Sequence, residues 1–493
     1  MLRNNFRSFI RTTAGYSLNT FVGPLFTLLL TPLYTRILGP ASYGNVDVLQ
    51  MLGNIISILG MLGLTASLAA SYYDSELDSD RQQLVSSAFW SALLWSCALS
   101  GLIIIFAEPI TRFTLGSPDL TDMTRIMALG LPFGVLYSLQ TMVLRLKSNV
   151  KRANLLALIY ILMVVPYNIL FIVVLRWGVA GVLSANVAVN ISAALLALAL
   201  APDGLRCWPH WSTMKLLARS GALLIPALLA TWSLGYIDRL FLVRYVAAEE
   251  IGLYSIAGKL ASMLGVALLA FSTAWLPFAL SIKHHPTAPR TYAKMLTYFC
   301  VGSLGLALGL SLFAHEILLI FTTYKFVDAA QYVWLLVIVP LTSGLNSILA
   351  IGLYIEKRLG QLSWTIGLSA AINIALNFLL IPRFGVFGAS AATAIAYLIS
   401  PALAAWASQR VYPLPYEWGR VLRVLLVYGI LLGLALRVGS QVELFSLGVR
   451  IGLFLAYLPL LLIVGTFEHW ELQLLRRFVS QPGLFFRWIT KRA

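Results

Sequence analysis

Charged side chains lie within apolar stretches on either side of short polar turns, where buried charges could bind an anionic ligand. Asp238, Arg239 and Arg244 precede a turn at 247–250, and Lys259 follows the end of that turn by nine residues. At 1.5 Å of rise per helical residue, Asp238 and Lys259 lie at one depth, roughly 12–15 Å into a hydrocarbon core about 30 Å thick. A charge at that depth is costly unless it is paired or faces water, and it marks a candidate functional site.

The cations of this stretch suit a phosphate or pyrophosphate ligand, because arginine offers a planar fork of donors and lysine a compact charge. Two interpretations of Lys259 stay open: it faces a cavity and contacts an anion, or it forms an internal ion pair with Asp238. Arg36 and Asp47 lie level about an earlier turn and present the same two possibilities. Arg36 and Arg244 also lie close enough to the turns for their long side chains to reach the membrane surface.

The composition shows which elements must position these charges. Hydrophobic residues make up 59% of the 493 residues, charged residues 11%, and the mean hydropathy is +0.85. This composition predicts an all-α polytopic membrane protein of about fourteen spans, since one span needs about 20 apolar residues. The expected spans are 13–38, 43–70, 84–107, 122–146, 153–175, 179–201, 216–245, 250–281, 292–314, 328–354, 362–381, 386–408, 420–437 and 446–466.

The net charge of +16 is explained by basic residues that lie between spans. No nucleic-acid motif accompanies them, and an excess of Lys and Arg in alternate connections places both termini in the cytoplasm. The basic, amphipathic start leads into a span without a small-residue cleavage pattern, so we expect it to be retained. The three cysteines, two in spans and one in a loop, indicate no disulfide framework.

The chain also repeats itself. Gly44 recurs as Gly252 and Pro132 as Pro340, and further matches share an offset of 207 or 208 residues. Because six spans separate the matching positions, the two halves enter the membrane in the same sense, an arrangement found in transporters with a site between repeats. The expected units are a six-helix half at 1–202, a second six-helix half at 203–411, two extra helices at 412–466 and an interfacial basic amphipathic tail at 467–493.

Two stretches carry a resemblance to a known family: TPLYTRILGPASYGNVDVLQMLGNIISILGMLGL at 31–64 and YIDRLFLVRYVAAEEIGLYSIAGKLAS at 236–262. They resemble the polysaccharide-transporter branch of the multidrug/oligosaccharidyl-lipid/polysaccharide exporter superfamily, the Wzx-type flippases. The resemblance implies movement of an undecaprenyl-pyrophosphate-linked oligosaccharide across the bacterial inner membrane by alternating access, in O-antigen, capsule or exopolysaccharide biosynthesis. It also implies lipid-linked oligosaccharide and the bilayer as partners, with other polysaccharide-assembly membrane proteins as further ones.

The candidate substrate-binding residues are Arg36, Asp47, Asp238, Arg239, Arg244 and Lys259, together with Asn19 and Thr20, whose polar groups could contact sugar hydroxyls or bond a neighbouring helix. We expect no cofactor and no metal site, and the residues do not identify a coupling ion.

Two other functions remain in competition with the flippase. A multidrug or other small-molecule exporter of the same superfamily should favour acidic residues in its spans, whereas Asp47 and Asp238 are outnumbered by basic neighbours. A membrane glycosyltransferase or polymerase needs catalytic residues on an extended outward loop, and the connections are short. We therefore expect a transporter and not an enzyme.

Overall fold

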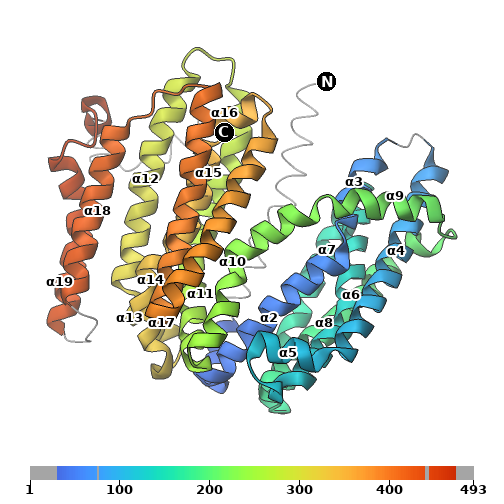
Figure 1. Ribbon diagram of the computed structural model, residues 1–493. Coiled ribbons are helices and arrows are strands. Elements are labelled where there is room, and N and C mark those ends of the chain that lie inside the picture. The colour runs from blue at the N-terminus through green and yellow to red at the C-terminus, as the bar shows by residue number, and fades with distance from the viewer. Residues whose placement is uncertain (1–29, 75–76, 439–443, 474–493) are drawn as a thin grey trace.

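The computed structural model describes residues 30–74, 77–438 and 444–473, and within these ranges the regular structure is entirely helical. Two helical bundles touch at one end and diverge toward the other, which gives the molecule the V shape seen in Figure 1. Two further helices, α18 (Trp418–Val438) and α19 (Leu444–Ile463), run along the outer side of the second bundle.

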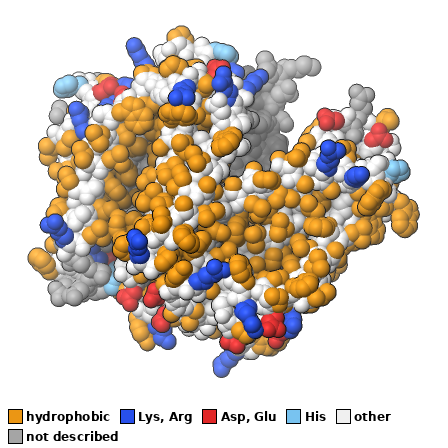
Figure 2. Space-filling model, viewed as in Figure 1, with side chains coloured by type: hydrophobic (Ala, Val, Ile, Leu, Met, Phe, Trp, Pro, Cys, Tyr) orange, Lys and Arg blue, Asp and Glu red, His pale blue; other side chains and the backbone are white. Residues whose placement is uncertain are grey.

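The helices have the length and polarity of membrane spans. Among the described residues, eleven helices are long and apolar enough to cross a membrane, and the bent pair α9 (Trp211–Ala222) and α10 (Ile225–Tyr245) makes a twelfth. Figure 2 shows hydrophobic side chains over most of the middle of the visible face and charged side chains gathered toward its two ends. The predicted all-α polytopic membrane fold is confirmed.

The helix α17 (Leu359–Val411) contains 53 residues, which would extend about 80 Å as one straight rod. Its backbone breaks at Gly385, where φ is 54° and ψ is −130°, values that glycine adopts without steric cost. The break separates two passes that correspond to the predicted spans 362–381 and 386–408. The first predicted span, 13–38, lies largely outside the described residues, so the count of fourteen stays a prediction.

The first bundle is centred on α6, which packs against both α4 and α8. Small polar side chains join these helices, as where the Ser100 hydroxyl donates to the Ala128 carbonyl at 2.7 Å. The helices of this bundle are α2 (Pro40–Met61), α3 (Leu64–Tyr72), α4 (Asp78–Ile105), α5 (Ala107–Leu115), α6 (Thr121–Leu146), α7 (Val150–Asn168), which a π-helix at Ile169–Val174 extends, and α8 (Gly178–Leu200).

The second bundle pairs α10 with α17 and α11 with α15. The remaining helices of this bundle are α11 (Ala248–Ser281), α12 (Ala288–Leu312), α13 (Ala314–Phe321), α14 (Ala330–Leu336), α15 (Ile338–Leu349) and α16 (Ile351–Ile355). One local feature recurs between the bundles: Gly178 begins α8 with a φ of 56°, and Gly385, which has a φ of 54°, begins the second pass of α17. The likeness agrees with the predicted repeat, whose full layout stays a prediction.

The helix α9 departs from the predicted division of the chain at residue 203. It follows that boundary, yet it packs on α3 and α4 of the first bundle, while α10 packs on α17 of the second. In Figure 1 it lies across the first bundle. The axis bends by 42° between α9 and α10, directly before Pro226, which has no backbone N–H to donate.

Glycines allow close backbone contacts at two places, one between the bundles and one between α9 and the first bundle. A Cβ on Gly44 of α2 would lie 2.1 Å from the Ala248 carbonyl oxygen, and one on Gly252 of α11 would lie 2.0 Å from the Pro40 carbonyl oxygen. At the other contact, a Cβ on Gly221 of α9 would lie 2.2 Å from the carbonyl oxygen of Leu62. Only glycine permits backbones to approach this closely.

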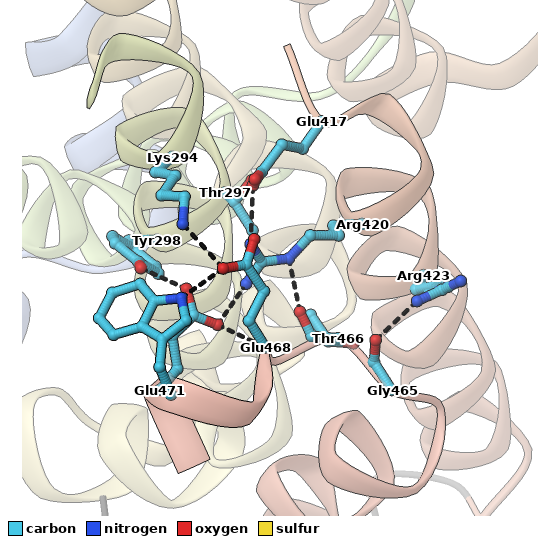
Figure 3. Close-up of polar contacts among 11 residues, drawn as sticks. Lys294, Thr297, Tyr298, Glu417, Arg420, Arg423, Gly465, Thr466, Glu468 and Glu471 are labelled. Carbon is cyan, nitrogen blue, oxygen red and sulfur yellow. Dashed lines mark hydrogen bonds and ion pairs between the residues drawn. The ribbon is translucent and has the colours of Figure 1, made fainter. Parts of the chain in front are cut away.

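An ionic cluster fastens the last helices to α12, on which both α18 and α19 pack (Figure 3). Arg420 Nη2 lies 2.6 Å from Glu471 Oε2 and Arg420 Nη1 lies 2.9 Å from Glu417 Oε2, while Lys294 Nζ lies 2.8 Å from Glu468 Oε2. We call Lys294, Glu417, Arg420, Glu468 and Glu471 the C-terminal cluster. Of the predicted tail at 467–493, only 467–473 belongs to the described residues.

Candidate functional site

The candidate site lies where α2 of the first bundle faces α10 and α11 of the second. The Gly44 and Gly252 contact brings these helices together, and both α10 and α11 pack on α2. Asp47 lies one helical turn beyond Gly44 and is thereby directed toward the second bundle. The close backbone approach therefore places charged side chains of the two bundles within reach of each other.

Arg239 joins the bundles through Asp47. Its Nε donates to Asp47 Oδ2 at 2.9 Å, and its Nη1 donates to Asp238 Oδ1 at 2.8 Å and to the Gly235 carbonyl at 2.9 Å. The side chains of Asp47 and Arg239 are each 12% exposed, and that of Asp238 is 2% exposed. We call Asp47, Asp238 and Arg239 the inter-bundle cluster.

Asp238 is held from the side opposite Arg239. The Tyr254 hydroxyl of α11 donates to its Oδ2, and the Thr393 hydroxyl of α17 donates to the same oxygen at 3.4 Å. The Arg239 guanidinium carbon also lies 5.0 Å from the centre of the Tyr254 ring, within the range of a cation–π contact. Asp238 is therefore satisfied within the second bundle, whereas Asp47 connects the two bundles.

Lys259 lies beside the inter-bundle cluster without joining it. Its Nζ is 4.7 Å from the centre of the Tyr43 ring and 5.9 Å from that of Tyr34. Among the described residues, no carboxylate oxygen lies within 4.0 Å of this ammonium group. The side chain also borders a small cavity of about 30 Å³, together with Thr31. The Lys259 ammonium is thus in contact with aromatic rings, and within the described part of the chain it forms no ion pair.

Two pairings that the sequence left open are replaced by different ones. Lys259 does not pair with Asp238, because Arg239, Tyr254 and Thr393 surround that carboxylate. The alternative in which Arg36 pairs with Asp47 does not hold either, since Asp47 binds Arg239 across the bundle interface. Which side chains meet depends on the direction of each around its helix axis, which counting residues from a turn does not give.

The structure places the other candidate residues apart from this cluster. Arg36 and Arg244 are exposed, and the Arg244 guanidinium carbon lies 4.9 Å from the centre of the Phe113 ring. Asn19 and Thr20 lie outside the described residues. The structure thus brings together Asp47, Asp238 and Arg239, with Lys259 beside them.

Sequence reasoning missed the hydroxyl and aromatic partners of these charges. Tyr254, Tyr43 and Thr393 look like ordinary packing residues in apolar spans, and only Tyr254 carries a usable signal. It lies on the hairpin partner of Asp238, four residues from the end of the turn at 247–250. Across the described ranges, no group of three or more His, Cys, Asp and Glu side chains could hold a metal ion.

In this arrangement a ligand anion can replace the Asp47 carboxylate as the partner of Arg239. The formal charges of Asp47, Asp238, Arg239 and Lys259 sum to zero, but the Lys259 ammonium stands apart from the two carboxylates. An incoming anion can contact this ammonium, and it can then compete with Asp47 for the Arg239 guanidinium. Since Asp47 belongs to the other bundle, such competition weakens the connection between the bundles.

The chain is similar to proteins of polysaccharide export. A family model described as polysaccharide biosynthesis protein matches residues 33–331, more than half of the chain. The succinoglycan biosynthesis transport protein ExoT of Rhizobium meliloti (strain 1021) is 27% identical over 124 residues, which are 25% of this chain and 24% of that protein. The match thus spans about a quarter of the relative's length.

Solved structures show the same fold. The lipid II flippase MurJ, in an inward closed conformation, superposes with a TM-score of 0.68 at 13% identity, covering 91% of this chain and 98% of that one. An inward-facing multidrug resistance transporter of the MATE family, a member of the MOP superfamily, gives a TM-score of 0.63 at 13% identity, covering 80% and 94%. At these identities the likeness concerns the fold alone.

Proposed function

The chain belongs to the polysaccharide biosynthesis protein family, and from this we propose that it is a flippase of lipid-linked oligosaccharide. The cargo is an undecaprenyl-pyrophosphate-linked repeat unit, which moves from the cytoplasmic to the periplasmic leaflet of the bacterial inner membrane. The pathway is the biosynthesis of O-antigen, capsule or exopolysaccharide, and the process is transport without catalysis. In this orientation both termini are cytoplasmic and the turns at 39 and 247 face the periplasm.

The observation that carries the proposal is an unpaired lysine beside an ion pair that joins the two bundles. Lys259 has no carboxylate within ion-pair distance among the described residues, and the Arg239 to Asp47 pair lies next to it. A pyrophosphate brings several oxygen acceptors and negative charges, which suit both a point charge and a planar fork of donors. Arg36 and Arg244, near the periplasmic turns, are available to the same anion after it has crossed.

The mechanism follows from competition for Arg239. With no substrate, the Asp47 to Arg239 pair and the close contact at Gly44 and Gly252 hold the bundles together at the periplasmic end, while the bundles diverge at the other end (Figure 1). A pyrophosphate bound to Lys259 and Arg239 displaces Asp47 and thereby favours the state in which the periplasmic end is open. A ligand shifts such an equilibrium only by its difference in affinity for the two states, and the displaced ion pair supplies that difference.

The same contacts weigh against a cationic drug as the cargo. Such a substrate requires a carboxylate that is free to receive it, and both carboxylates of the inter-bundle cluster are bound to Arg239. The flippase therefore accounts for the residues of the site better than the multidrug exporter does.

The proposal is tested by Lys259→Ala in proteoliposomes that contain undecaprenyl-pyrophosphate-linked oligosaccharide. We expect the variant to fold normally and to flip at least about tenfold more slowly, because a hydrogen bond to a charged group contributes about 1.5–3 kcal/mol. Lys259→Arg should retain part of the activity. Gly258→Ala is the matched control, since a Cβ there meets open space. Full flipping by Lys259→Ala at equal protein level would remove the proposed role of this lysine.

A further inference from the structure

The polar face of α2 continues beyond Asp47. Gln50, Asn54 and Ser57 follow Asp47 at spacings of three, seven and ten residues, which place them on one side of the helix. They line a cavity of about 270 Å³ between α2, α6, α7 and α8 of the first bundle. The cavity therefore begins about one helical turn from the inter-bundle cluster, or roughly 4.5 Å along the axis of α2.

The lining of this cavity is polar and uncharged. Its other polar side chains are Tyr160 of α7 and two residues of α8, Asn186 and Asn190. The Tyr160 hydroxyl lies 3.5 Å from Asn190 Oδ1, and among the described residues Gln50, Asn54 and Asn186 have no hydrogen-bond partner. The donors and acceptors of these amide groups are therefore available to a ligand that enters the cavity.

Glycines keep the cavity open on the side of α6. A Cβ on Gly134 would lie 3.4 Å from Asn190 Nδ2, and one on Gly130 would lie 3.1 Å from a Val187 methyl carbon. Both glycines lie in α6, where alanine would favour the helix by about 1 kcal/mol. Their presence therefore preserves space at the expense of helix propensity. The volume suits one small ring, since it is close to the lower limit of about 300 Å³ for ligand pockets.

We propose that this cavity binds a sugar ring of the translocated oligosaccharide. Carboxamides offer a donor and an acceptor side by side and so match neighbouring hydroxyl groups of a pyranose, while the uncharged lining admits neutral sugars. Tyr160 belongs to the same wall, and its ring is held by stacking on Tyr137 with 4.7 Å between ring centres. The inference rests on the proposed flippase function, because the pyrophosphate at Lys259 and Arg239 places the attached sugar beside Gln50.

The test compares three lipids that differ only in the sugar. The full-length protein in nanodiscs is titrated with undecaprenyl pyrophosphate and with the same lipid bearing one hexose, prepared as glucose and as galactose forms. We expect at least one hexose form to bind about fivefold or more tightly than the sugar-free lipid, since one net hydrogen bond contributes about 1 kcal/mol. Equal affinity for all three lipids would overturn the inference.

Variants assign this preference to the cavity. Asn54→Leu combined with Asn186→Leu should abolish the preference for hexose and leave the affinity for the sugar-free lipid within about twofold, because both side chains are exposed to the cavity and carry no structural hydrogen bond. Thr273→Leu, at an exposed position of α11 outside the cavity, is the control and should keep the preference. A preference that survives in the folded double variant contradicts the proposal.

A second variant leaves every polar group in place and removes only space. Gly134→Ala adds one carbon beside the Asn190 amide and should also reduce the preference for hexose, with unchanged binding of the sugar-free lipid. Lys259→Ala should do the opposite and weaken all three lipids equally. A failure of the flippase proposal therefore appears as no binding of any lipid, whereas a failure of the sugar site appears as binding without discrimination.

Discussion

The C-terminal cluster and the inter-bundle cluster are built in different ways. In the C-terminal cluster, Arg420 contacts three carboxylates, and its Nε donates to the Thr466 carbonyl at 2.6 Å. In the inter-bundle cluster, one hydrogen bond of Arg239 reaches the opposite bundle and all its others stay within its own. The first cluster distributes its connection over many bonds, and the second concentrates it in one.

This difference indicates different tasks. A network in which each charge has several partners is lost only if many bonds break together, so the C-terminal cluster holds α18 and α19 permanently on α12. A single ion pair between bundles can be exchanged for a ligand at small cost, since Arg239 keeps Asp238 when Asp47 leaves. We infer that the first cluster maintains the fold and that the second regulates contact between the bundles.

The largest effect should come from Arg420→Ala. This change leaves Glu417, Glu468 and Glu471 without their shared cation, and breaking a buried ion pair in this way costs about 3–5 kcal/mol. We expect a marked loss of thermal stability in detergent. Arg423→Ala is the control, because that exposed side chain donates one hydrogen bond, to the Gly465 carbonyl at 2.6 Å. Equal stability of the two variants would contradict the role given to the C-terminal cluster.

A smaller loss of stability, with a larger loss of transport, should follow Gly44→Ala. The new Cβ would lie 2.1 Å from the Ala248 carbonyl oxygen, so α2 and α11 must separate at a cost of about 1–3 kcal/mol. A cysteine at Ser42 should then react faster with an impermeant thiol reagent applied from the periplasmic side. Gly258→Ala again serves as the control. Unchanged reactivity at Ser42 would show that the glycine contact does not close this end.

Asp47→Asn should change stability by only about 1 kcal/mol, because Arg239 retains its pair with Asp238. Its main expected effect is on the equilibrium between conformations, measured as faster labelling of the same cysteine at Ser42 without substrate. Asp238→Asn is the informative comparison, since it disturbs only contacts within the second bundle. If both variants label at the rate of the parent, the ion pair does not couple the bundles.

The smallest effect concerns pH. Hydrogen bonds from Lys294 and from the Trp470 indole hold the pKa of Glu468 below its ordinary value of 4.5. The stabilisation is therefore complete above pH 4.5 and is lost as the pH falls through the lower pKa of the folded state. It should stay below about 1 kcal/mol, because the side chain is partly exposed. The melting temperatures of the parent and Glu468→Gln should accordingly differ near neutral pH and converge in acid.

Sequence reasoning could locate the charged site but not its pairings. Counting residues from the turn at 247–250 places Asp238 and Lys259 at one depth, and depth depends only on the helical rise. Which side chains meet depends on rotation about each helix and on side-chain length. Arg239 directly follows Asp238, so its Cα–Cβ bond leaves the helix in a different direction. Its long side chain nevertheless bends back to the Asp238 carboxylate and also reaches Asp47. Such a contact across 192 residues leaves no local signal.

The breaks in the helices show the same limit. The stretches 43–70 and 216–245 read as single spans because their hydrophobic pattern is continuous, yet the first breaks after Met61 and the second bends before Ile225. Gly63 and Pro226 were local hints of these breaks. The packing of α9 on the first bundle could not be foreseen, because it follows from the bend and not from the composition of α9.

The bent pair α9 and α10 has a mechanical consequence. Because α9 is packed on one bundle and α10 on the other, the connection between the bundles is a bent helix pair and not a flexible linker. Sliding of one bundle past the other would break the contacts of α9 with α3 and α4, whereas a change in the 42° angle between α9 and α10 would keep them. Gly221 contacts the backbone of Leu62 and Gly63 next to this bend and thereby fixes the position about which the angle changes. We infer that the bundles move relative to each other mainly by a change in this angle.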